Sequence, residues 1–379
     1  MSVNQEGTQI EGEHADMLRD ALSGLTSRPK SIPGKYLWDD IGSDLYDRIC
    51  HYNDYYPSRQ ELSLLAAIKS DISDRIGPSA TVVEFGSGAS RKIRTLLDAL
   101  IQPHTYVAID ISREYLNAAI QQLKFDYPAI QMIPVCADYT ETVHVPLNLS
   151  GRAVLGFYPG PSIGNFRPDD ARIFLEHART TLGSSLFLIG TDGTRDAARL
   201  KQAYAGADGL MAAFHLNVLA RLNRECDADF DVENFDHTIR LFRHPDRVEA
   251  HLVARASAEY HLGAQSIPFE AGDSILTDTS YKYTPEDFHA LASSAGWKLV
   301  RSGTGIVTEH DRILSLLGEA ELLDQIADTF TRAGATNVVE GRRDSARNLQ
   351  RVARDHRIRA MLARARAAEL LGHELPDLE

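Results

Sequence analysis

The sequence predicts an α/β fold in which a doubly wound, parallel sheet carries an inserted α+β domain and a helical C-terminal extension. Two observations indicate the sheet. Apolar, β-branched runs alternate with helical runs between residues 81 and 192. The first run, TVVEFGSGASRK (residues 81–92), passes from a strand through a Gly-Ser-Gly turn into a helix, which is typical of such sheets. The insertion is indicated because the alternation stops near Asp192 and a strand–helix pattern returns only later.

Each element of the sheet has its own pattern. The strand runs after TVVEF are TYVAID, IQMIPVCADY, RAVLGFYPGPSIGNF and SSLFLIGTD, and PDDARIFLEHARTTL is the expected crossover helix. Residues 196–226 read as helical and 246–262 as extended and antiparallel. Residues 269–297 return through a strand to a helix, and 298–305 with 310–317 read as a final strand pair. The resulting organisation is a disordered N-terminus (1–15), the first part of a substrate domain (16–70), the core of the sheet domain (71–195), the inserted substrate domain (196–285), the end of the core (286–317) and the helical extension (318–379).

Composition restricts the class of function. The chain of 379 residues has 40 Lys and Arg against 53 Asp and Glu, a net charge of −13, which argues against a nucleic-acid or anionic-membrane partner. No apolar run resembles a signal peptide or a transmembrane helix, so we expect a soluble, cytoplasmic protein. The three cysteines are scattered, and the histidines form no paired motif, so we expect neither a disulfide framework nor a metal site.

The strand ends indicate the ligand of the sheet. The turn at Gly86 does not match the dinucleotide pattern, because Arg91 stands where a third glycine is required. Asp110 ends the next strand run, where an acid can accept hydrogen bonds from ribose hydroxyls, and Asp138-Tyr139 ends the third, where it can meet an adenine. This ordered triplet favours S-adenosylmethionine over NAD as cofactor. The alternative is a doubly wound domain with ordinary acids at its strand ends.

The C-terminal extension is rich in arginine. It reads as a solvated or oligomer-forming helix, and the alternative is a docking surface for an acidic protein partner. Within it, the segment 342–371 carries Arg at positions 342, 343, 347, 351, 354, 357, 359, 364 and 366.

Several motifs outside the sheet resemble one known family. PKSIPGKYLWDDIGSDLYDRI, YYPSR, VEFGSGASRK, SIGNF, IGTD, AAFHLNVLARLNRE, ADFD and TDTSYKYTPEDF occur in the order seen in the ergothioneine-pathway histidine Nα-methyltransferases. The resemblance covers residues 16–317 and leaves the extension outside. It implies a Rossmann-like methyltransferase domain with a second domain, adding methyl groups from S-adenosylmethionine to the α-amine of a free amino acid.

The resemblance also implies roles for individual residues. Tyr55 and Asn165 are expected to hold the substrate amine and carboxylate and are the expected catalytic residues, with Tyr204 as a further carboxylate ligand. Asp278 and Ser280 fall where the family recognises the substrate side chain, and Ala250 lines the same pocket. The expected cofactor-binding residues are Trp38, Gly86, Ser87, Gly88, Lys92, Asp110, Asp138 and Tyr139.

Four departures from the family pattern concern the pocket. The histidine enzymes carry Glu where Asp278 stands and Met where Ala250 stands, and both changes enlarge the pocket. Trp38 replaces a Tyr, and His215, expected to be a core histidine, replaces a common Asn. L-Histidine is the expected substrate. The alternatives are tryptophan, tyrosine or a modified aromatic amino acid, and a non-catalytic binding module.

Overall fold

The computed structural model describes residues 3–52, 54–87, 91–206 and 209–302, and a few positions between 353 and 364. Residues 1–303 form one compact unit and residues 304–379 a second. The predicted extension and most of the predicted final strand pair lie outside the described residues. Gly88 also lies outside them.

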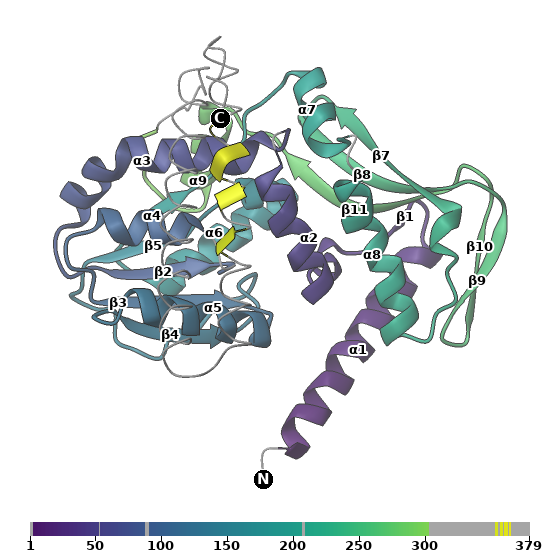
Figure 1. The fold of residues 1–379 in the computed structure, drawn as a ribbon, viewed down its shortest axis with the longest axis horizontal. Helices are drawn as coiled ribbons and strands as arrows, with labels where there is room; N and C mark the ends of the chain where they lie inside the picture. Colours follow the sequence, from purple (N-terminus) through teal and green to yellow (C-terminus); the bar gives the residue numbers. More distant parts are fainter. Residues whose placement is uncertain are drawn as a thin grey trace. The chain divides into compact units, whose positions relative to one another are not determined.

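The larger unit has two halves, each built on its own sheet and neither continuous in sequence. The first half, which includes residues 56–189 and 285–294, contains a five-stranded, entirely parallel sheet (Figure 1). Its strand order is β4-β3-β2-β5-β6, as expected for a doubly wound sheet. The strands are β2 (Thr81–Phe85), β3 (Thr105–Asp110), β4 (Gln131–Cys136), β5 (Val154–Tyr158) and β6 (Leu186–Ile189). The helices that follow or flank them are α3 (Tyr56–Ile76), α4 (Arg91–Ala99), α5 (Arg113–Asp126), α6 (Pro168–Leu182) and α9 (Pro285–Ser294).

Both faces of this sheet are covered by helices. Alternate residues of each strand point to opposite faces, so the strands contribute side chains to two cores. Val82 packs with Leu65 of α3 and with the apolar side chains of α4 and α5. Val83 packs on the other face with Phe174 of α6 and with residues next to and within α9. The helices therefore cover the sheet from both sides, which leaves its strand ends as the accessible edge.

Two features differ from the sequence prediction in this half. The chain between β4 and β5 contains no helix, so the strand–helix alternation is interrupted there. Its apolar side chains Val143, Val145, Leu147 and Leu149 pack onto the α6 face instead. The domain boundary expected at residue 70 falls inside α3, since Leu65 and Ile72 both belong to the core of the parallel sheet.

The second half is built on a sheet with the order β1-β11-β8-β7 (Figure 1). It comprises β1 (Lys30–Ser31), β7 (Phe235–Phe242), β8 (Arg247–Ala254) and β11 (Ser274–Tyr281), beside a hairpin of β9 (Ala258–Leu262) and β10 (Gln265–Phe269). Its helices are α1 (Val3–Thr26), α2 (Asp40–His51), α7 (Ala197–Tyr204) and α8 (Leu210–Glu225), with short 3₁₀ turns η1 (Gly34–Leu37), η2 (Pro161–Asn165) and η3 (Val232–Asn234). One apolar core joins the helices α1, α2 and α8 to this sheet.

The ends of the larger unit also differ from expectation. α1 begins at Val3, although residues 1–15 were predicted to be disordered. Met17, Ala21 and Leu25 are buried at helical spacing, and once such a segment is packed, each further residue adds a hydrogen bond at little cost. The described part of the predicted strand after Trp297 is not a strand, and Leu299 and Val300 are exposed. None of the helices in the described ranges has the length and apolar character needed to span a bilayer.

Candidate active site

The site begins where the parallel sheet changes winding direction. β2 lies between β3 and β5, so the chain winds outward through β3 and β4 and then returns to β5 on the other side of β2. Such a switch point leaves a crevice beyond the carboxyl ends of the two central strands. Gly86 follows β2 with φ of 73°, and Gly160 follows β5 with φ of 79°. Both backbones take a conformation that favours glycine, which also permits a ligand to approach closely.

Glu84 of β2 lies two residues before Gly86, at the base of the crevice. It is fully buried, and its Oε2 accepts a hydrogen bond from Tyr106 Oη, which also lies 3.3 Å from Ser87 Oγ. Burial raises the pKa of Glu84 to about 8, so its carboxyl group keeps its proton over much of the neutral range. Among the described residues, Glu84 Oε1 has no hydrogen-bond partner. The group is thus an unusual, unsatisfied acid beside Gly86 rather than a surface charge.

The two strand-end acids are arranged differently. Asp110 Oδ1 accepts a hydrogen bond from Ser112 N at 2.9 Å, and burial raises the pKa of Asp110 to about 6. Asp138 is exposed, and its Oδ1 accepts hydrogen bonds from both the backbone and the hydroxyl group of Thr140. The structure therefore brings Asp110 to the end of β3 and Asp138 just beyond β4, on neighbouring strands of the parallel sheet.

Tyr139 closes the crevice on the side of β4. Its ring packs edge-on against Tyr158 and Phe174, at centroid distances of 5.8 and 5.9 Å. A Cβ atom placed on Gly86 would lie 3.4 Å from Tyr139 Oη, so the tyrosine directly faces the glycine turn. The pairing of these two residues, which are far apart in sequence, defines one wall of the crevice.

Lys92 lies at the opposite side, next to β5. Its Nζ forms a 2.6 Å ion pair with Glu61 Oε2, and both side chains are largely buried. Glu61 Oε1 also accepts a hydrogen bond from Gly160 N at 2.6 Å. Nothing in the sequence pattern marks Glu61, because the contact joins α3 to a loop that is distant along the chain. Lys92 is therefore paired with an acid that also holds the turn after β5 through a hydrogen bond.

An aromatic wall leads from this crevice into the second half of the unit. Tyr55 is buried, its hydroxyl lies 3.2 Å from Tyr46 Oη, and its ring meets that of Tyr204 edge-on at 6.0 Å. Trp38 packs edge-on against Tyr46 and Phe214. Trp38 therefore belongs to the same wall as Tyr55, to which Tyr46 links it.

A buried polar cluster adjoins Tyr204. Lys282 Nζ donates hydrogen bonds to Asp192 Oδ2 at 2.7 Å, Tyr204 Oη at 2.8 Å and Ser280 Oγ at 2.9 Å. Tyr56 Oη donates to the same Asp192 oxygen at 2.6 Å. Burial alone would lower the pKa of Lys282, but Tyr204 and Asp192 outweigh it and the pKa is raised. Sequence reasoning singled out Tyr204 and Ser280 but missed Lys282, Asp192 and Tyr56 as their partners.

Asp278 and Ser280 are alternate residues of β11, and Lys282, which directly follows the strand, donates to Ser280; we call these three residues the β11 stripe. Asp278 lies opposite Ala250 of β8 in the strand register, after an irregularity at residue 276. Burial raises the pKa of Asp278 to about 7, although the Thr279 backbone and Lys282 counteract the rise. A Cβ on Gly34 would lie 3.2 Å from Asp278 Oδ1, so the η1 segment closes over this acid.

Asn165 follows a glycine that packs against the same strand. It ends η2, and a Cβ on the preceding Gly164 would lie 2.4 Å from Tyr281 O, so only glycine permits this close packing against β11. The Asn165 side chain is exposed, and no hydrogen bond of its amide is recorded among the described residues. Asn165 and the β11 stripe are therefore held close together, and the amide is available to a ligand.

His215 is a buried core residue. Thr277 Oγ1 donates to Ala250 O at 3.2 Å and lies 2.9 Å from His215 Nδ1, so the histidine nitrogen is the donor in that contact. Its ring stacks on His237 at 4.7 Å. Burial holds the pKa of His215 well below its usual value, so the ring is neutral. No cluster of three or more potential metal ligands occurs in the part of the chain that the structure describes.

The chain is similar in sequence to one family of known proteins. A family model described as histidine-specific methyltransferase, S-adenosylmethionine-dependent, matches residues 17–306. Histidine N-alpha-methyltransferase of Mycolicibacterium smegmatis is 38% identical over 285 residues, covering 73% of this chain and 88% of the relative.

Two fungal proteins are more distant relatives. Ergothioneine biosynthesis protein 1 of Neurospora crassa is 28% identical, covering 73% of this chain and 32% of its own length. The 4-dimethylallyltryptophan N-methyltransferase of Aspergillus fumigatus is 27% identical, covering 73% and 86%. The family match spans the crevice, the aromatic wall and the β11 stripe, and this chain belongs to the family of S-adenosylmethionine-dependent, histidine-specific methyltransferases.

Proposed function

We propose that the protein transfers methyl groups from S-adenosylmethionine to the α-amine of free L-histidine, ending in the trimethyl betaine of the ergothioneine pathway. One observation carries the proposal beyond family membership. Groups suited to an amino acid's amine, carboxylate and ring converge on the end of β11, although they come from distant parts of the chain. These groups are Tyr55, Asn165, Tyr204, Asp278 and Ser280.

The crevice at the switch point suits the cofactor. Gly86 provides backbone space, and Asp110 lies where ribose hydroxyls would be held. Tyr139 offers a ring beside the glycine turn, and Glu84 Oε1 offers a buried acceptor or donor without a partner among the described residues. We assign cofactor binding to these residues together with Ser87, Lys92, Asp138, Trp38 and Gly88. When bound, the cofactor supplies a methyl group already activated by its sulfonium.

The residues of the site then have to position a neutral amine and exclude water. Burial keeps the pKa of Tyr55 well above its usual value, so its hydroxyl stays protonated and serves as a hydrogen-bond donor or acceptor rather than a base. Asn165 cannot titrate, so it can orient the amine through successive methylations without a change of charge. We assign the removal of the ammonium proton to solvent, and the carboxylate to Tyr55 and Tyr204.

Asp278 is the proposed ligand of the imidazole ring. With a pKa of about 7, it can accept a hydrogen bond from the ring as a carboxylate or donate one as an acid. Its carboxylate is one methylene shorter than that of the glutamate in the histidine enzymes, and Ala250 lies directly opposite. The pairing of a short acid with a small residue favours a second candidate, the same reaction on tryptophan, tyrosine or a modified aromatic amino acid.

A separate proposal concerns a binding role for the arginine-rich C-terminal extension. The positive charge of its segment 342–366 would suit an acidic protein partner or a second copy of the chain. A protein ending near residue 318 tests this. Unchanged turnover together with an unchanged oligomeric state in light scattering would show that the extension is needed neither for catalysis nor for self-association.

The function is tested by incubating the purified protein with S-adenosylmethionine and each of the twenty amino acids separately, followed by mass spectrometry. The expected result is a gain of three methyl groups on histidine alone. Methylation of tryptophan or tyrosine instead would favour the second candidate. Absence of product across the panel, with cofactor binding retained, would favour a modified substrate or a binding module.

A further inference from the structure

Lys282 is the most fully buried cation of the site. Its side chain is 1% exposed, and its ammonium group makes three hydrogen bonds, to Asp192, Tyr204 and Ser280. An ammonium has three protons to donate and no acceptor. All three protons are therefore used within the protein, so Lys282 has none left for a ligand of its own.

This count determines which hydrogen bonds the hydroxyl groups of Tyr204 and Ser280 can make with a ligand. Each oxygen accepts a hydrogen bond from Lys282, which occupies one of its lone pairs and leaves the hydroxyl proton to be donated elsewhere. The two oxygens lie 3.3 Å apart, and at most one hydroxyl can donate to the other. At least one of the two protons has no acceptor among the described residues. Because 3.3 Å is long for a hydrogen bond between two hydroxyls, both can turn their protons toward a ligand, and the neighbouring cation polarises them.

Asp192 holds Lys282 in this position. Its Oδ2 accepts from both Lys282 and Tyr56, and its Oδ1 accepts from Thr194 N at 2.9 Å. Burial alone would raise the pKa of Asp192, but Lys282 and Tyr56 hold it below its usual range, so the acid remains charged. The ion pair is neutral as a whole, so it orients hydroxyl protons without adding net charge to the site.

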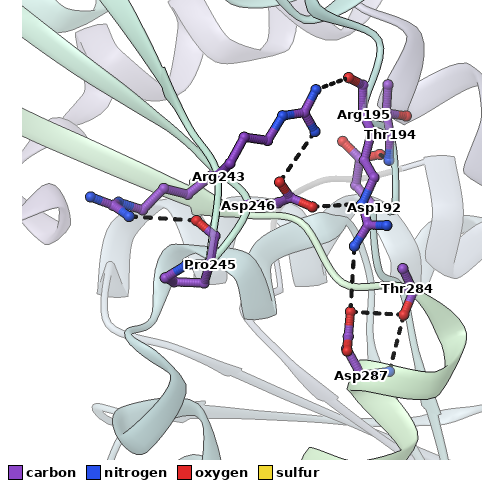
Figure 2. A network of polar contacts seen from close by, with 9 residues as sticks. Asp192, Thr194, Arg195, Arg243, Pro245, Asp246, Thr284 and Asp287 are labelled. Carbon is purple, nitrogen blue, oxygen red and sulfur yellow. Dashed lines mark hydrogen bonds and ion pairs between the residues drawn. The ribbon is translucent and has the colours of Figure 1, made fainter.

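The loop that carries Asp192 is itself fixed by ion pairs, as Figure 2 shows. Arg195 lies 2.6 Å from Asp246 of the β7–β8 turn and 3.7 Å from Asp287 of α9. Arg243 binds both Asp246 and the backbone oxygen of Arg195. A cavity of about 320 Å³ is lined by Arg195, Asp246 and Asp287 together with Lys282, and Arg195 is already paired with both aspartates. We regard this network as support for the loop.

We propose that Lys282 is a positioning residue for the amino-acid substrate, acting through Tyr204 and Ser280 by making both hydroxyls donate toward it. Tyr204 then donates to the substrate carboxylate, and Ser280 to an acceptor nitrogen of the side chain. The inference rests on the proposed function for the identity of the substrate. A purely structural lysine, which only neutralises the buried Asp192, would give no such coupling to Tyr204.

A double-mutant cycle separates the two roles. Lys282→Met alone would leave Asp192 charged and unpaired, so the variant used is Lys282→Met with Asp192→Asn, which removes both charges. It is combined with Tyr204→Phe, and the Kd of L-histidine is measured by calorimetry on the full chain with S-adenosylhomocysteine bound. Each change alone should raise this Kd roughly 10- to 100-fold, because each removes a polarised hydrogen bond to a charged group. The combination should raise it little further, because both changes remove the same contact.

Two outcomes overturn the proposal. Multiplicative effects of the two changes would show that Lys282 does not act through Tyr204, and so would an unchanged Kd in the charge-pair variant. The Kd of S-adenosylhomocysteine serves as the folding control and should change less than about 2-fold, since a shift this small is within ordinary surface effects.

Should the charge-pair variant fail to fold, Lys282→Arg retains the charge but not the three-way geometry, and the same cycle applies to it. If the unsubstituted protein binds no L-histidine, the proposed function fails. If it binds L-histidine but shows no coupling, only the role of Lys282 fails.

Discussion

Asp278 and Ala250 are direct neighbours across the strand pair β11 and β8, although 28 positions separate them along the chain. The register places a half-buried acid opposite a side chain with a single methyl group. In the histidine enzymes that the sequence resembles, both positions carry larger residues. Under the proposed function, this pair as a unit would set the space available to a substrate ring.

Replacing Asp278 by Glu should raise kcat/KM for L-histidine about 10-fold, because one methylene in a binding pocket is worth this much. The measurement is the initial rate of methylation of L-histidine and of L-tryptophan, with Asp74→Glu on the exposed face of α3 as the matched control. If the variant loses activity on histidine and the parent prefers tryptophan, the pocket is built for a bulkier ring.

Replacing Asn165 by Ala should lower kcat/KM for the amino acid roughly 100-fold, since a positioned polar group at a reacting centre contributes about this much. Asn165 is exposed and makes no recorded hydrogen bond within the described residues, so the free energy of unfolding should change by less than about 0.5 kcal/mol. The Kd of S-adenosylmethionine should stay the same. Retained turnover would remove Asn165 from the site, and Asn148→Ala on the loop before β5 provides the control.

Replacing Gly86 by Ala should weaken cofactor binding about 10-fold, because the added Cβ enters the crevice beside Tyr139 at a positive φ. Gly77 is a matched control, since it has φ of 75° and nothing within 4 Å of an added Cβ. Both variants should lose a similar amount of stability, about 1 kcal/mol. Equal cofactor affinities in the two variants would contradict the placement of the cofactor at Gly86.

Glu84 should make stability depend on pH. Its folded pKa of about 8 lies above the value of about 4.3 in an unfolded chain, so between these values the folded protein holds a proton that the unfolded chain has released. The stability contributed by the protonated group is present in full below about pH 4 and is lost as pH rises through about 8. Glu84→Gln removes this loss.

The free energy of unfolding of the Glu84→Gln variant should therefore improve relative to the parent protein by a few kcal/mol between pH 5 and pH 8. Urea unfolding of the cofactor-free protein at several pH values provides the measurement. Parallel pH profiles of the two proteins would show that the Glu84 pKa is not raised in the folded state.

The parallel sheet was predictable because its signals are local. Each strand is a short apolar run, and the turn at Gly86 and the acid Asp110 follow their strands directly in sequence. The resemblance placed the substrate residues on the chain, and the structure gathers Tyr55, Tyr204 and Ser280 as neighbours. Their roles in binding remain predictions.

The rest depends on long-range contacts that no local pattern specifies. Lys282 and Asp192 look like ordinary strand-end residues in sequence, and only the packing of β11 beside the loop after β6 joins them. β7 was missed because His237 and Phe242 interrupt the alternation of apolar and polar residues in a strand that is only partly buried. The helix missing between β4 and β5 reflects an apolar segment that packs without regular hydrogen bonding.

The measurement that tests the account most directly is the position of the methyl groups on the product formed from L-histidine. Tandem mass spectrometry and NMR of that product should place three methyl groups on the α-nitrogen and none on the imidazole, because Asn165 is assigned to the amine, Tyr55 to the carboxylate and Asp278 to the ring. Methyl groups on a ring nitrogen would mean that the substrate lies in the opposite orientation, and the assignment of every residue around β11 would be wrong.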